Sequence, residues 1–368
     1  MLNNQIKRFK MFYSIVYSCN NDYVPFTYIS IVSLIQHSSI MNNYNIYILY
    51  SDISKENQKY LRELQQQNIR IFLIDVSKIK KQYGPDFATN FHFSIETYYR
   101  FFLPQLFPNL DKIIYIDADT IVLKDVSKLF TIDIANNYIG VTRDCEIIRS
   151  SNLYGEKYSD YFTKILGLKN IKNYFQAGVM IVNIKKWRED KIQQKLLERL
   201  KEVKKPQFVD QDILNSVCQE NVMFIEQNWN YTWHIPIIDK QYYQHIGIPY
   251  NRNYEKAKIQ PYIIHFTGQN FKPLNYPWLP ESKLFWQYAR QTPFYEELLF
   301  KSMQLNLSSN LSFPTVVNLV NYSKNRFNYY RCKLLANLTF GNMRKHYKDK
   351  KKKLKAKIKA VKQFLKEK

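Results

Sequence analysis

Residues 113–123 read IIYIDADTIVL, and the interpretation of the whole chain starts from this stretch. Its first four residues are β-branched or aromatic, which indicates a buried strand. Asp117 and Asp119 stand at the end of that strand, and a second apolar run, TIVL, follows them directly. Along an extended chain every second side chain points the same way, so we expect both carboxylates on one side of the strand end.

This pair of carboxylates predicts a metal site. Two adjacent anions repel each other unless a cation joins them. Mg²⁺ and Mn²⁺ bind carboxylate oxygens together with substrate phosphates, and they neutralise a diphosphate leaving group. The alternative is a pair of solvated turn residues after a strand. The apolar runs on both sides of the pair favour the metal, because a solvated turn seldom lies between two such runs.

Strand and helix patterns alternate on both sides of this stretch. Apolar runs predict strands over residues 11–18, 44–50, 70–75, 111–116, 138–142 and 178–183. Helices are expected over residues 26–37, 54–67, 94–103 and 185–203, and Ser54 is a suitable N-cap. Such alternation is typical of an α/β protein with a mostly parallel sheet covered by helices. Ligands of such sheets bind beyond the carboxyl ends of the strands, where Asp117 and Asp119 stand.

Glycine and cysteine usage narrows the chemistry. The chain has only 8 Gly, and none of them falls in G-x-G-x-x-G or G-x-x-x-x-G-K. The glycine-rich phosphate-binding motifs are therefore missing, and phosphates would have to be bound by a metal or by side chains. The 4 Cys are far apart in the sequence, which predicts neither a zinc site nor a disulfide framework.

The C-terminal part has a different composition. The formal net charge is +23, and 12 Lys and 1 Arg stand among the 25 residues 344–368. Apolar residues recur there at helical spacing, at Leu354, Ile358, Val361 and Leu365. A basic amphipathic helix of this kind binds anionic membrane surfaces, although a Lys-rich helix can also be a solvated face. We expect a catalytic domain over 11–276, a mostly helical extension over 277–343 and this tail over 344–368.

The expected location follows from the same pattern. No stretch reaches the roughly 18–20 apolar residues that span a bilayer. The prediction is a cytoplasmic protein, peripheral on the inner face of the membrane, with the basic tail as the anchor. Helix-turn-helix, zinc-finger and base-stacking motifs are missing from the sequence, so no nucleic-acid partner is expected.

An ordered set of motifs resembles glycosyltransferase family 8. They are YSCNNDY (residues 17–23), SIETYYR (94–100), YIDADTIVLKD (115–125), FQAGVMIVNIKKWR (175–188), DQDILN (210–215) and HFTG (265–268) followed by a Lys-Pro pair. The resemblance covers roughly residues 12–275. The bacterial members of this family include galactosyl- and glucosyltransferases of lipopolysaccharide synthesis, whose C-terminal extension the last part of the chain resembles.

The resemblance implies a GT-A, Rossmann-like fold and a retaining glycosyl transfer. Glucose or galactose would move from a UDP-sugar to a glycan or lipooligosaccharide acceptor, with Mn²⁺ or Mg²⁺ bound. Asp117 and Asp119 match the metal-binding aspartates of the family, and His265 matches the histidine that completes the metal shell. A neutral imidazole beside two carboxylates suits Mn²⁺.

The other site residues are carried over from the same motifs. The family pattern assigns Ser18, Asn20 and Asp22 to uracil and ribose, Arg100 and Ala118 to the donor, Gln176 and Ala177 to the sugar, Gly268 and Lys272 to the diphosphate, and Asp210 and Gln211 to the surroundings of the reacting carbon. The family often has Asp at the position of Asn20 and Asn at that of Gln176. The longer Gln176 could change which sugar fits.

Several alternatives stay open. Asp212 could serve the site or only the first turn of its helix, and Arg100 could be a helix-capping residue. The chemistry could be that of an inverting GT-A transferase, which the anomeric configuration of the product would separate from a retaining one. The protein could instead be a non-catalytic polyanion- or membrane-binding protein whose function lies in the basic tail. A self-glycosylating member of the family is a further possibility.

Overall fold

Two β-sheets organise the computed structural model of the protein, which describes residues 12–89, 94–233, 247, 250–268, 272–308 and 341–364. The larger sheet has seven strands in the order β3-β2-β1-β4-β7-β6-β8, and the smaller has three in the order β5-β10-β9. The strands are β1 (Phe12–Ser18), β2 (Asn43–Tyr50), β3 (Ile69–Asp75), β4 (Lys112–Ile116), β5 (Thr120–Val122), β6 (Ile139–Arg143), β7 (Phe175–Asn183), β8 (Val222–Phe224), β9 (Tyr231–Thr232) and β10 (Ile263–His265).

The larger sheet is mostly parallel, as the sequence predicts. Strands β1, β2, β3 and β4 pair in parallel, and so do β6 and β8. Strand β7 is the exception, because it runs antiparallel to both β4 and β6. The smaller sheet joins β10 antiparallel to β5, the strand that follows Asp119 directly. This pairing brings the end of β10 beside the end of β4.

The sheet separates two hydrophobic cores, because alternate residues of each strand face opposite sides. Ile114 and Ile116 of β4 pack in one core, together with residues of α1, β5 and β10. Ile113 and Tyr115 pack in the other, with residues of α9 and α10. These four β4 side chains are at most 1% exposed, so the strand that leads to Asp117 is covered on both faces.

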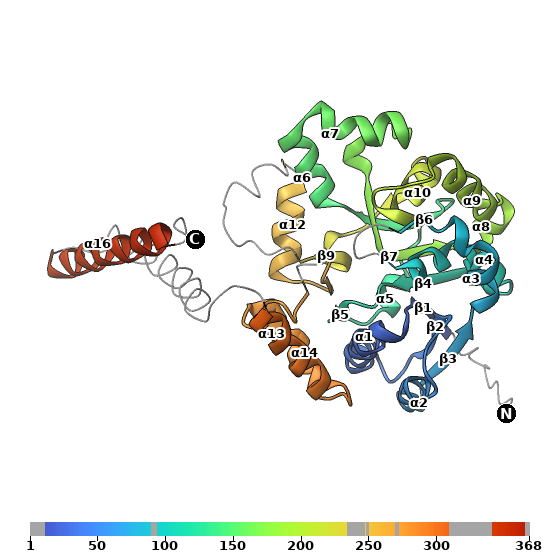
Figure 1. Ribbon diagram of the computed structural model, residues 1–368, viewed down its shortest axis with the longest axis horizontal. Helices are drawn as coiled ribbons and strands as arrows, with labels where there is room; N and C mark the ends of the chain where they lie inside the picture. Colours follow the sequence, from blue (N-terminus) through green and yellow to red (C-terminus); the bar gives the residue numbers. More distant parts are fainter. Residues whose placement is uncertain are drawn as a thin grey trace, which may run out of the picture. The chain divides into compact units, whose positions relative to one another are not determined.

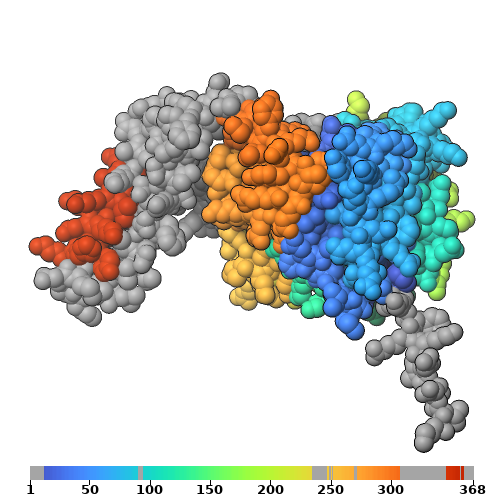
Figure 2. All heavy atoms as spheres, turned by 90° about the horizontal axis from the view of Figure 1, so that it is seen from below, coloured from blue at the N-terminus to red at the C-terminus, as the bar shows by residue number. Residues whose placement is uncertain are grey.

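Helices lie on both sides of the sheet (Figure 1). The helices of the described residues are α1 (Val24–His37), α2 (Lys55–Glu63), α3 (Ser77–Tyr83), α4 (Leu103–Leu106), α5 (Ser127–Phe130), α6 (Cys145–Tyr154), α7 (Glu156–Asp160), α8 (Ile184–Glu189), α9 (Ile192–Val203), α10 (Val209–Cys218), α12 (Tyr250–Ile259), α13 (Pro280–Ala289), α14 (Tyr295–Ser308) and, in a separate unit of the chain, α16 (Gly341–Phe364). In Figure 2 the orange atoms, which include α13, lie beside the blue N-terminal segments. Helix α13 contacts α1, and Phe285 packs against Phe26 with ring centroids 5.7 Å apart.

Two of the expected helices differ from the prediction. The helix expected over 185–203 is divided into α8 and α9, because Lys191 between them has a left-handed backbone with φ of 54°. Neither Gly nor Pro stands at this break, so the sequence carries no signal for it. The segment expected as a helix over 94–103 is a 3₁₀ helix, η3 (Ile95–Phe102). Its aromatic residues Tyr98, Tyr99, Phe101 and Phe102 are all buried.

Backbone contacts divide the chain into two units, residues 1–298 and 299–368. The second unit contains α16, a helix rich in Lys over residues 341–364, as expected for the tail. Leu365 of the expected apolar stripe, and residues 309–340 of the expected helical extension, lie outside the described residues. The domain boundaries at 276 and 343 therefore stay predictions. None of the described helices has the length and apolar character needed to cross a bilayer.

Candidate active site

The turn after β4 fixes the two aspartates that the sequence singled out. The backbone N–H of Asp117 donates to Gly178 O on β7 at 2.7 Å. The carbonyl of Asp119 accepts from the backbone N–H of Phe266, after β10, at 3.0 Å. Thr120 closes the turn by donating from Oγ1 to Asp117 O at 2.9 Å. The turn is therefore bonded to both neighbouring strands, and its carboxylates have a defined position.

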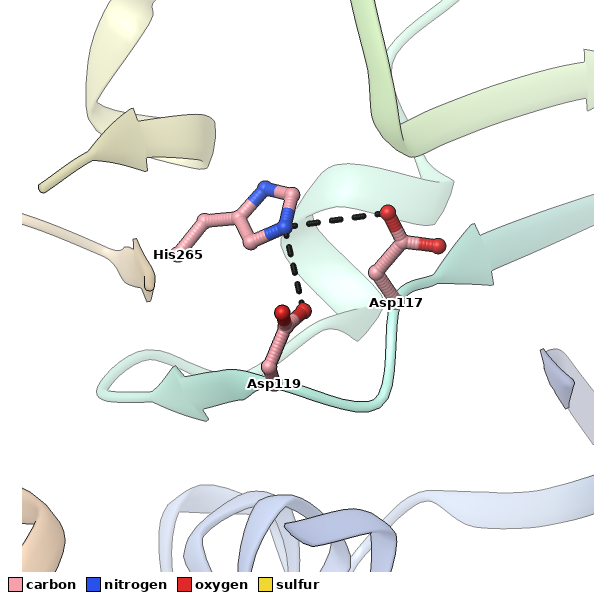
Figure 3. A group of neighbouring side chains, drawn as sticks. All are labelled: Asp117, Asp119 and His265. Atoms are coloured by element: carbon pink, nitrogen blue, oxygen red, sulfur yellow. Dashed lines mark ion pairs between the residues drawn. The ribbon is translucent and has the colours of Figure 1, made fainter. Parts of the chain in front are cut away.

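His265 lies between the two carboxylates (Figure 3). Its Nε2 is 3.7 Å from Asp117 Oδ2 and 3.2 Å from Asp119 Oδ1. The three ligand atoms lie within 4.8 Å of one another, and the histidine is 2% exposed. The sheet creates this grouping, because His265 pairs with Thr120 across the β10–β5 ladder. The three residues predicted as metal ligands are thus together in space.

Gly178 makes room for this cluster. A Cβ added at this position would lie 2.6 Å from Asp117 Oδ2 and still closer to Cε1 of His265. Contacts so short do not occur, so any side chain at residue 178 would displace the cluster. Two carboxylates and an imidazole are a donor set that suits Mn²⁺ or Mg²⁺. The residues present therefore fit a divalent metal ion.

Lys272 lies on the Asp119 side of the cluster. Its Nζ contacts Asp119 Oδ2 and donates to Phe266 O at 2.8 Å. Burial alone would raise the pKa of Asp119, but the ammonium charge of Lys272, together with the contact to His265, outweighs burial and lowers the pKa. Asp119 therefore remains an anion across the physiological range of pH.

Arg100 lies on the opposite side of the pocket, between Asp117 and Asp210. It is 3% exposed; its Nη2 donates to Asp117 Oδ1 at 2.8 Å, and its Nη1 donates to Ala177 O at 2.6 Å. Its Nε is 3.0 Å from Asp210 Oδ2, but the hydrogen on Nε points to Thr97 O, 2.9 Å away. Arg100 therefore holds Asp117 by a hydrogen bond. It places its positive charge beside Asp210 but donates no hydrogen bond to Asp210 Oδ2.

The carboxylate of Asp210 is consequently only partly hydrogen-bonded. Its Oδ1 accepts from the hydroxyl of Thr97, whereas the buried Oδ2 accepts no hydrogen bond from any described residue. Burial raises the pKa of Asp210 to about 6, against the lowering effect of Arg100. Val209, which precedes it, has φ of 43°, a left-handed backbone that a β-branched residue rarely adopts. Such strain together with an unsatisfied carboxylate oxygen is typical of functional sites.

The amide of Gln211 is held in one orientation. Its Oε1 accepts from Ala177 N at 3.0 Å, and its Nε2 donates to Asp144 Oδ2 at 3.0 Å. Asp144 itself caps α6 by accepting from the backbone N–H groups of Glu146 and Ile147. Burial raises the pKa of Asp144 to about 6. Gln211 thus connects β7, through Ala177, to the start of α6, through Asp144.

Asp212, for which the sequence allows either a functional or a structural role, is fully buried. Its carboxylate accepts from the hydroxyls of Tyr161 and Tyr174, both at 2.6 Å, and from Phe208 N at 2.8 Å. It does not line the pocket. Its observed contacts are those of a residue that stabilises the turn leading into α10.

Of the three residues assigned to uracil and ribose, Ser18 and Asn20 line the pocket and Asp22 does not. Ser18 donates from Oγ to Glu96 O at 2.6 Å, and Asn20 accepts from Tyr23 N at 3.0 Å, as the N-cap of a short 3₁₀ helix. Both nevertheless line the pocket. Asp22 is exposed and is not among the lining residues. The backbone after β1 therefore reaches the pocket through Ser18 and Asn20.

The site residues surround one cavity of about 430 Å³ at the carboxyl end of β4. All the predicted site residues except Asp22 line it. Lining residues that the sequence analysis did not single out include Asp144, Glu146, Arg149, Thr232 and Thr267. Asp144 could have been found from the sequence, because it follows the predicted strand over 138–142 and ligands bind beyond strand ends. The others have no comparable signal.

Fold and pocket together define a class of protein: an α/β domain of the GT-A type, with an Asp-x-Asp turn at the end of a central strand. The profile described as Glycosyl transferase family 8 matches residues 14–278. The chain therefore belongs to glycosyltransferase family 8.

Individual relatives agree with this assignment. A Haemophilus influenzae protein named as a glycosyltransferase is 31% identical over 60% of this chain and 63% of its own length. The lipopolysaccharide 1,2-glucosyltransferase of Escherichia coli K12 is 26% identical over 69% of this chain and 71% of its own. The first of these relatives is therefore matched over less than two thirds of its length.

Solved structures show the same fold. The bifunctional glycosyltransferase WbbM is 28% identical, with a TM-score of 0.71 over 80% of this chain and 52% of that chain. The galactosyltransferase LgtC, solved with donor and acceptor sugar analogues, is 22% identical, with a TM-score of 0.62 over 78% of this chain and 99% of that chain. These likenesses confirm the predicted GT-A fold.

Proposed function

We propose that the protein is a metal-dependent hexosyltransferase that moves glucose or galactose from a UDP-sugar to a glycan acceptor and retains the anomeric configuration. One observation carries the proposal: Asp117, Asp119 and His265 offer three ligand atoms within 4.8 Å of one another, in a cavity of about 430 Å³. Membership of glycosyltransferase family 8 supports the class of reaction.

Asp117, Asp119 and His265 are the residues that would hold Mn²⁺ or Mg²⁺. A divalent ion bound there supplies positive charge to the diphosphate as it leaves. Arg100 keeps Asp117 in place, and Lys272 lies close enough to add an ammonium charge to the phosphates. Both cations come from the protein itself, so part of the negative charge of the leaving group is balanced by fixed side chains.

The nucleotide would lie against the loop after β1. Ser18, Asn20 and Tyr23 line the pocket there, and the ring of Tyr23 offers a flat face for a base. Gly268 has φ of 80°, a conformation that suits glycine and brings the backbone close to the pocket. Its neighbour Thr267 has a buried hydroxyl oxygen without a partner among the described residues, which suits a phosphate contact.

The transfer breaks the bond between the anomeric carbon and the phosphate oxygen, and forms a bond from that carbon to an acceptor hydroxyl oxygen. The acceptor proton goes to the departing diphosphate. Asp210 contributes negative charge near the positively charged anomeric carbon, through the oxygen that accepts no hydrogen bond from the described residues. Asp210 could alternatively form a covalent intermediate, whereas both ends of the Gln211 amide are already hydrogen-bonded.

The acceptor would enter past Asp144, Glu146 and Arg149, which line the pocket near the start of α6. We propose a lipopolysaccharide-type or other surface glycan as acceptor, which the similarity to the lipopolysaccharide 1,2-glucosyltransferase supports. Polar, hydrogen-bonding side chains of this kind suit the hydroxyl groups of a sugar.

We also propose that the C-terminal helix binds the inner surface of the membrane. Helix α16 carries Lys along most of its length, which suits anionic lipid headgroups. Vesicle sedimentation of the full chain, compared with a chain ending at residue 343, tests this. Loss of binding to anionic vesicles on truncation supports the proposal, whereas equal binding of both proteins contradicts it.

Hydrolysis of UDP-glucose and UDP-galactose, with and without Mn²⁺, tests the proposed activity in the wild type and in Asp119→Ala. We expect release of UDP that needs Mn²⁺ and disappears in the variant. Product anomer analysis by NMR then separates a retaining from an inverting enzyme. If neither protein turns over or binds UDP in the presence of metal, the proposal fails and the polyanion-binding alternative is favoured.

A further inference from the structure

A chain of buried hydrogen bonds reaches His265 from behind. Asn230, at the end of the 3₁₀ helix η6 (Gln227–Asn230), is fully buried. Its Oδ1 is 3.1 Å from His265 Nδ1, and its Nδ2 donates to Gln176 Oε1 at 2.6 Å. The same Gln176 oxygen accepts from Gly178 N at 2.6 Å. Three separate segments, β7, η6 and β10, therefore meet behind the ring that faces the two aspartates.

The backbone of Gly178 determines the direction of every hydrogen bond in this chain. A backbone N–H can only donate, so the atom of Gln176 beside it must be the oxygen. That oxygen accepts, so the Asn230 atom facing it must be the NH₂ group. The other end of the Asn230 amide is then its oxygen, which can only accept. His265 Nδ1 therefore carries a hydrogen and donates it to Asn230.

We infer that Gln176 and Asn230 are positioning residues for His265 as a metal ligand. With Nδ1 bonded to Asn230, the other ring nitrogen, Nε2, is turned to Asp117 and Asp119 and is the atom available to a metal. A partner at the far nitrogen fixes both the tautomer and the orientation of a metal-binding imidazole. The inference rests on the proposed metal site, and it assigns these two side chains a role in metal affinity.

The hydrogen bonds that hold the His265 ring are buried, which strengthens them. Gln176 is 8% exposed, Asn230 is not exposed at all, and His265 is 2% exposed. Buried polar groups are costly to leave unpaired, so the amides have no alternative partner in water. Gln227 also holds the Asn230 backbone in place, because its Nε2 donates to Asn230 O at 3.2 Å. A rotated Asn230 would place two oxygens or two N–H groups against each other.

The two ends of the Gln176 side chain have different roles. The family resemblance assigns this residue to the donor sugar, but its oxygen is already bonded to Gly178 and Asn230. Gln176 also lines the pocket, so its NH₂ group remains as the part that can meet a ligand. Its oxygen therefore serves His265, and only its nitrogen end can serve the sugar.

Mn²⁺ titrations without any nucleotide, followed by the electron paramagnetic resonance signal of free Mn²⁺, test the inference. Asn230→Leu removes the acceptor for Nδ1–H, and we expect Mn²⁺ to bind about 10–100-fold more weakly. Gln176→Met should weaken binding in the same direction, by less. Gln176→Glu keeps an oxygen that accepts from both donors, and we expect an affinity close to that of the wild type.

Asn228→Leu is the matched control. Asn228 lies in the same short helix and is 1% exposed, but its Nδ2 donates to Gln260 O at 2.7 Å, away from His265. Asn228→Leu should lower the unfolding temperature while the Mn²⁺ affinity stays unchanged. Circular dichroism of all variants shows which of them fold, and Gln176→Met provides the test if Asn230→Leu does not fold.

A spectroscopic measurement addresses the ring itself. Long-range ¹H–¹⁵N spectra of the Mg²⁺-loaded protein should show protonated Nδ1 and unprotonated Nε2 in His265, assigned by comparison with His265→Gln. A protonated Nε2 with a bare Nδ1 overturns the inference, as does normal Mn²⁺ affinity in a folded Asn230→Leu. Failure of the proposed function looks different: the wild type would bind Mn²⁺ with the expected tautomer yet release no UDP.

Discussion

Asp119 and Asp210 line the same pocket and are both largely buried, yet the pKa of Asp119 is lowered and that of Asp210 is raised to about 6. Burial acts in the same direction on both. The difference comes from their neighbours. The ammonium of Lys272 contacts Asp119 directly, whereas the guanidinium of Arg100 lies beside Asp210 with its Nε–H bonded to Thr97.

One pocket therefore holds a permanent anion, Asp119, and a protonatable carboxyl, Asp210. A permanent anion suits a metal ligand, because the ligand must be deprotonated to bind. A carboxyl with a raised pKa suits the place where charge changes during a reaction. The Asp119 side would therefore bind, and the Asp210 side would act on the reacting carbon.

Gly178→Ala should have the largest effect, because it disturbs the cluster that both sides depend on. The added Cβ would displace His265 and Asp117, and we expect metal-dependent UDP release to fall by about a thousandfold or more. Steady-state kinetics at saturating Mn²⁺ measures this. Gly140→Ala is the control, because the nearest atoms to its Cβ would be side-chain carbons of Ile134 and Ile181 in the core, away from the metal ligands. Equal losses in both variants would show that the effect is general destabilisation.

Conservative amide variants separate the two sides. Asp119→Asn should weaken Mn²⁺ binding by about 100-fold or more, because a charged ligand is lost. Asp210→Asn should keep Mn²⁺ affinity but lower kcat by about 100- to 1,000-fold, the size expected for a group that stabilises transition-state charge. Metal titrations and UDP-release assays on both variants give the answer. A comparable loss of metal affinity in Asp210→Asn would remove the distinction between the sides.

Stability should depend on the protonation of Asp210. Its pKa is raised from 3.8 to about 6, so the folded state holds the proton more tightly than the unfolded chain does. The stabilisation is complete below about pH 4 and is lost as the pH rises through about 6, by at most about 3 kcal/mol. Urea unfolding of the wild type and Asp210→Asn from pH 4.5 to 7 measures the difference.

Asp75→Asn provides a control of opposite sign, because hydrogen bonds from Ser77 lower the pKa of Asp75. Its contribution is present above the ordinary pKa of 3.8 and is lost only as the pH falls below that value, so it should stay constant between pH 4.5 and 7. If the difference between the wild type and Asp210→Asn does not change between pH 4.5 and 7, Asp210 has an ordinary pKa, and the contrast with Asp119 is wrong.

Lys272→Met should have the smallest effect and an unusual direction. The ammonium occupies an oxygen of Asp119 that a metal also needs, so its removal should tighten Mn²⁺ binding without nucleotide by roughly tenfold. The same variant should bind UDP more weakly, because a cation beside the diphosphate is lost. Calorimetric titrations with Mn²⁺ alone and with UDP plus Mn²⁺ separate the two effects. Weaker binding of Mn²⁺ alone would show that Lys272 supports the metal ligands.

The sequence was most informative where a local pattern sufficed. The apolar run before Asp117, its period-two alternation and the repeated strand–helix order together predict the parallel sheet and the location of the site at the end of β4. The antiparallel direction of β7 was not predictable, because a buried strand has the same composition in either direction.

The rest of the site depends on contacts between distant segments. Asn230 lies in none of the family motifs, and its role appears only when η6 lies behind β10. The family pattern alone points to Asp22, which proves to be exposed, whereas Asp144 lines the pocket although no family motif contains it. The left-handed backbone at Lys191 and Val209 likewise has no signal in the sequence, since neither residue type favours it.

The burial of Asn230 also bears on how the protein can be produced. Residues 230–232 read NYT, an acceptor triplet for N-linked glycans. In the folded protein the amide is inaccessible and hydrogen-bonded at both ends. A chain exported through a eukaryotic secretory pathway, however, meets the glycosylation machinery before it folds. A glycan attached to Asn230 there would use up the amide that faces Gln176 and could not fit behind His265. Active protein should therefore come from bacterial expression, or from a secretory host only after Thr232→Ala removes the triplet.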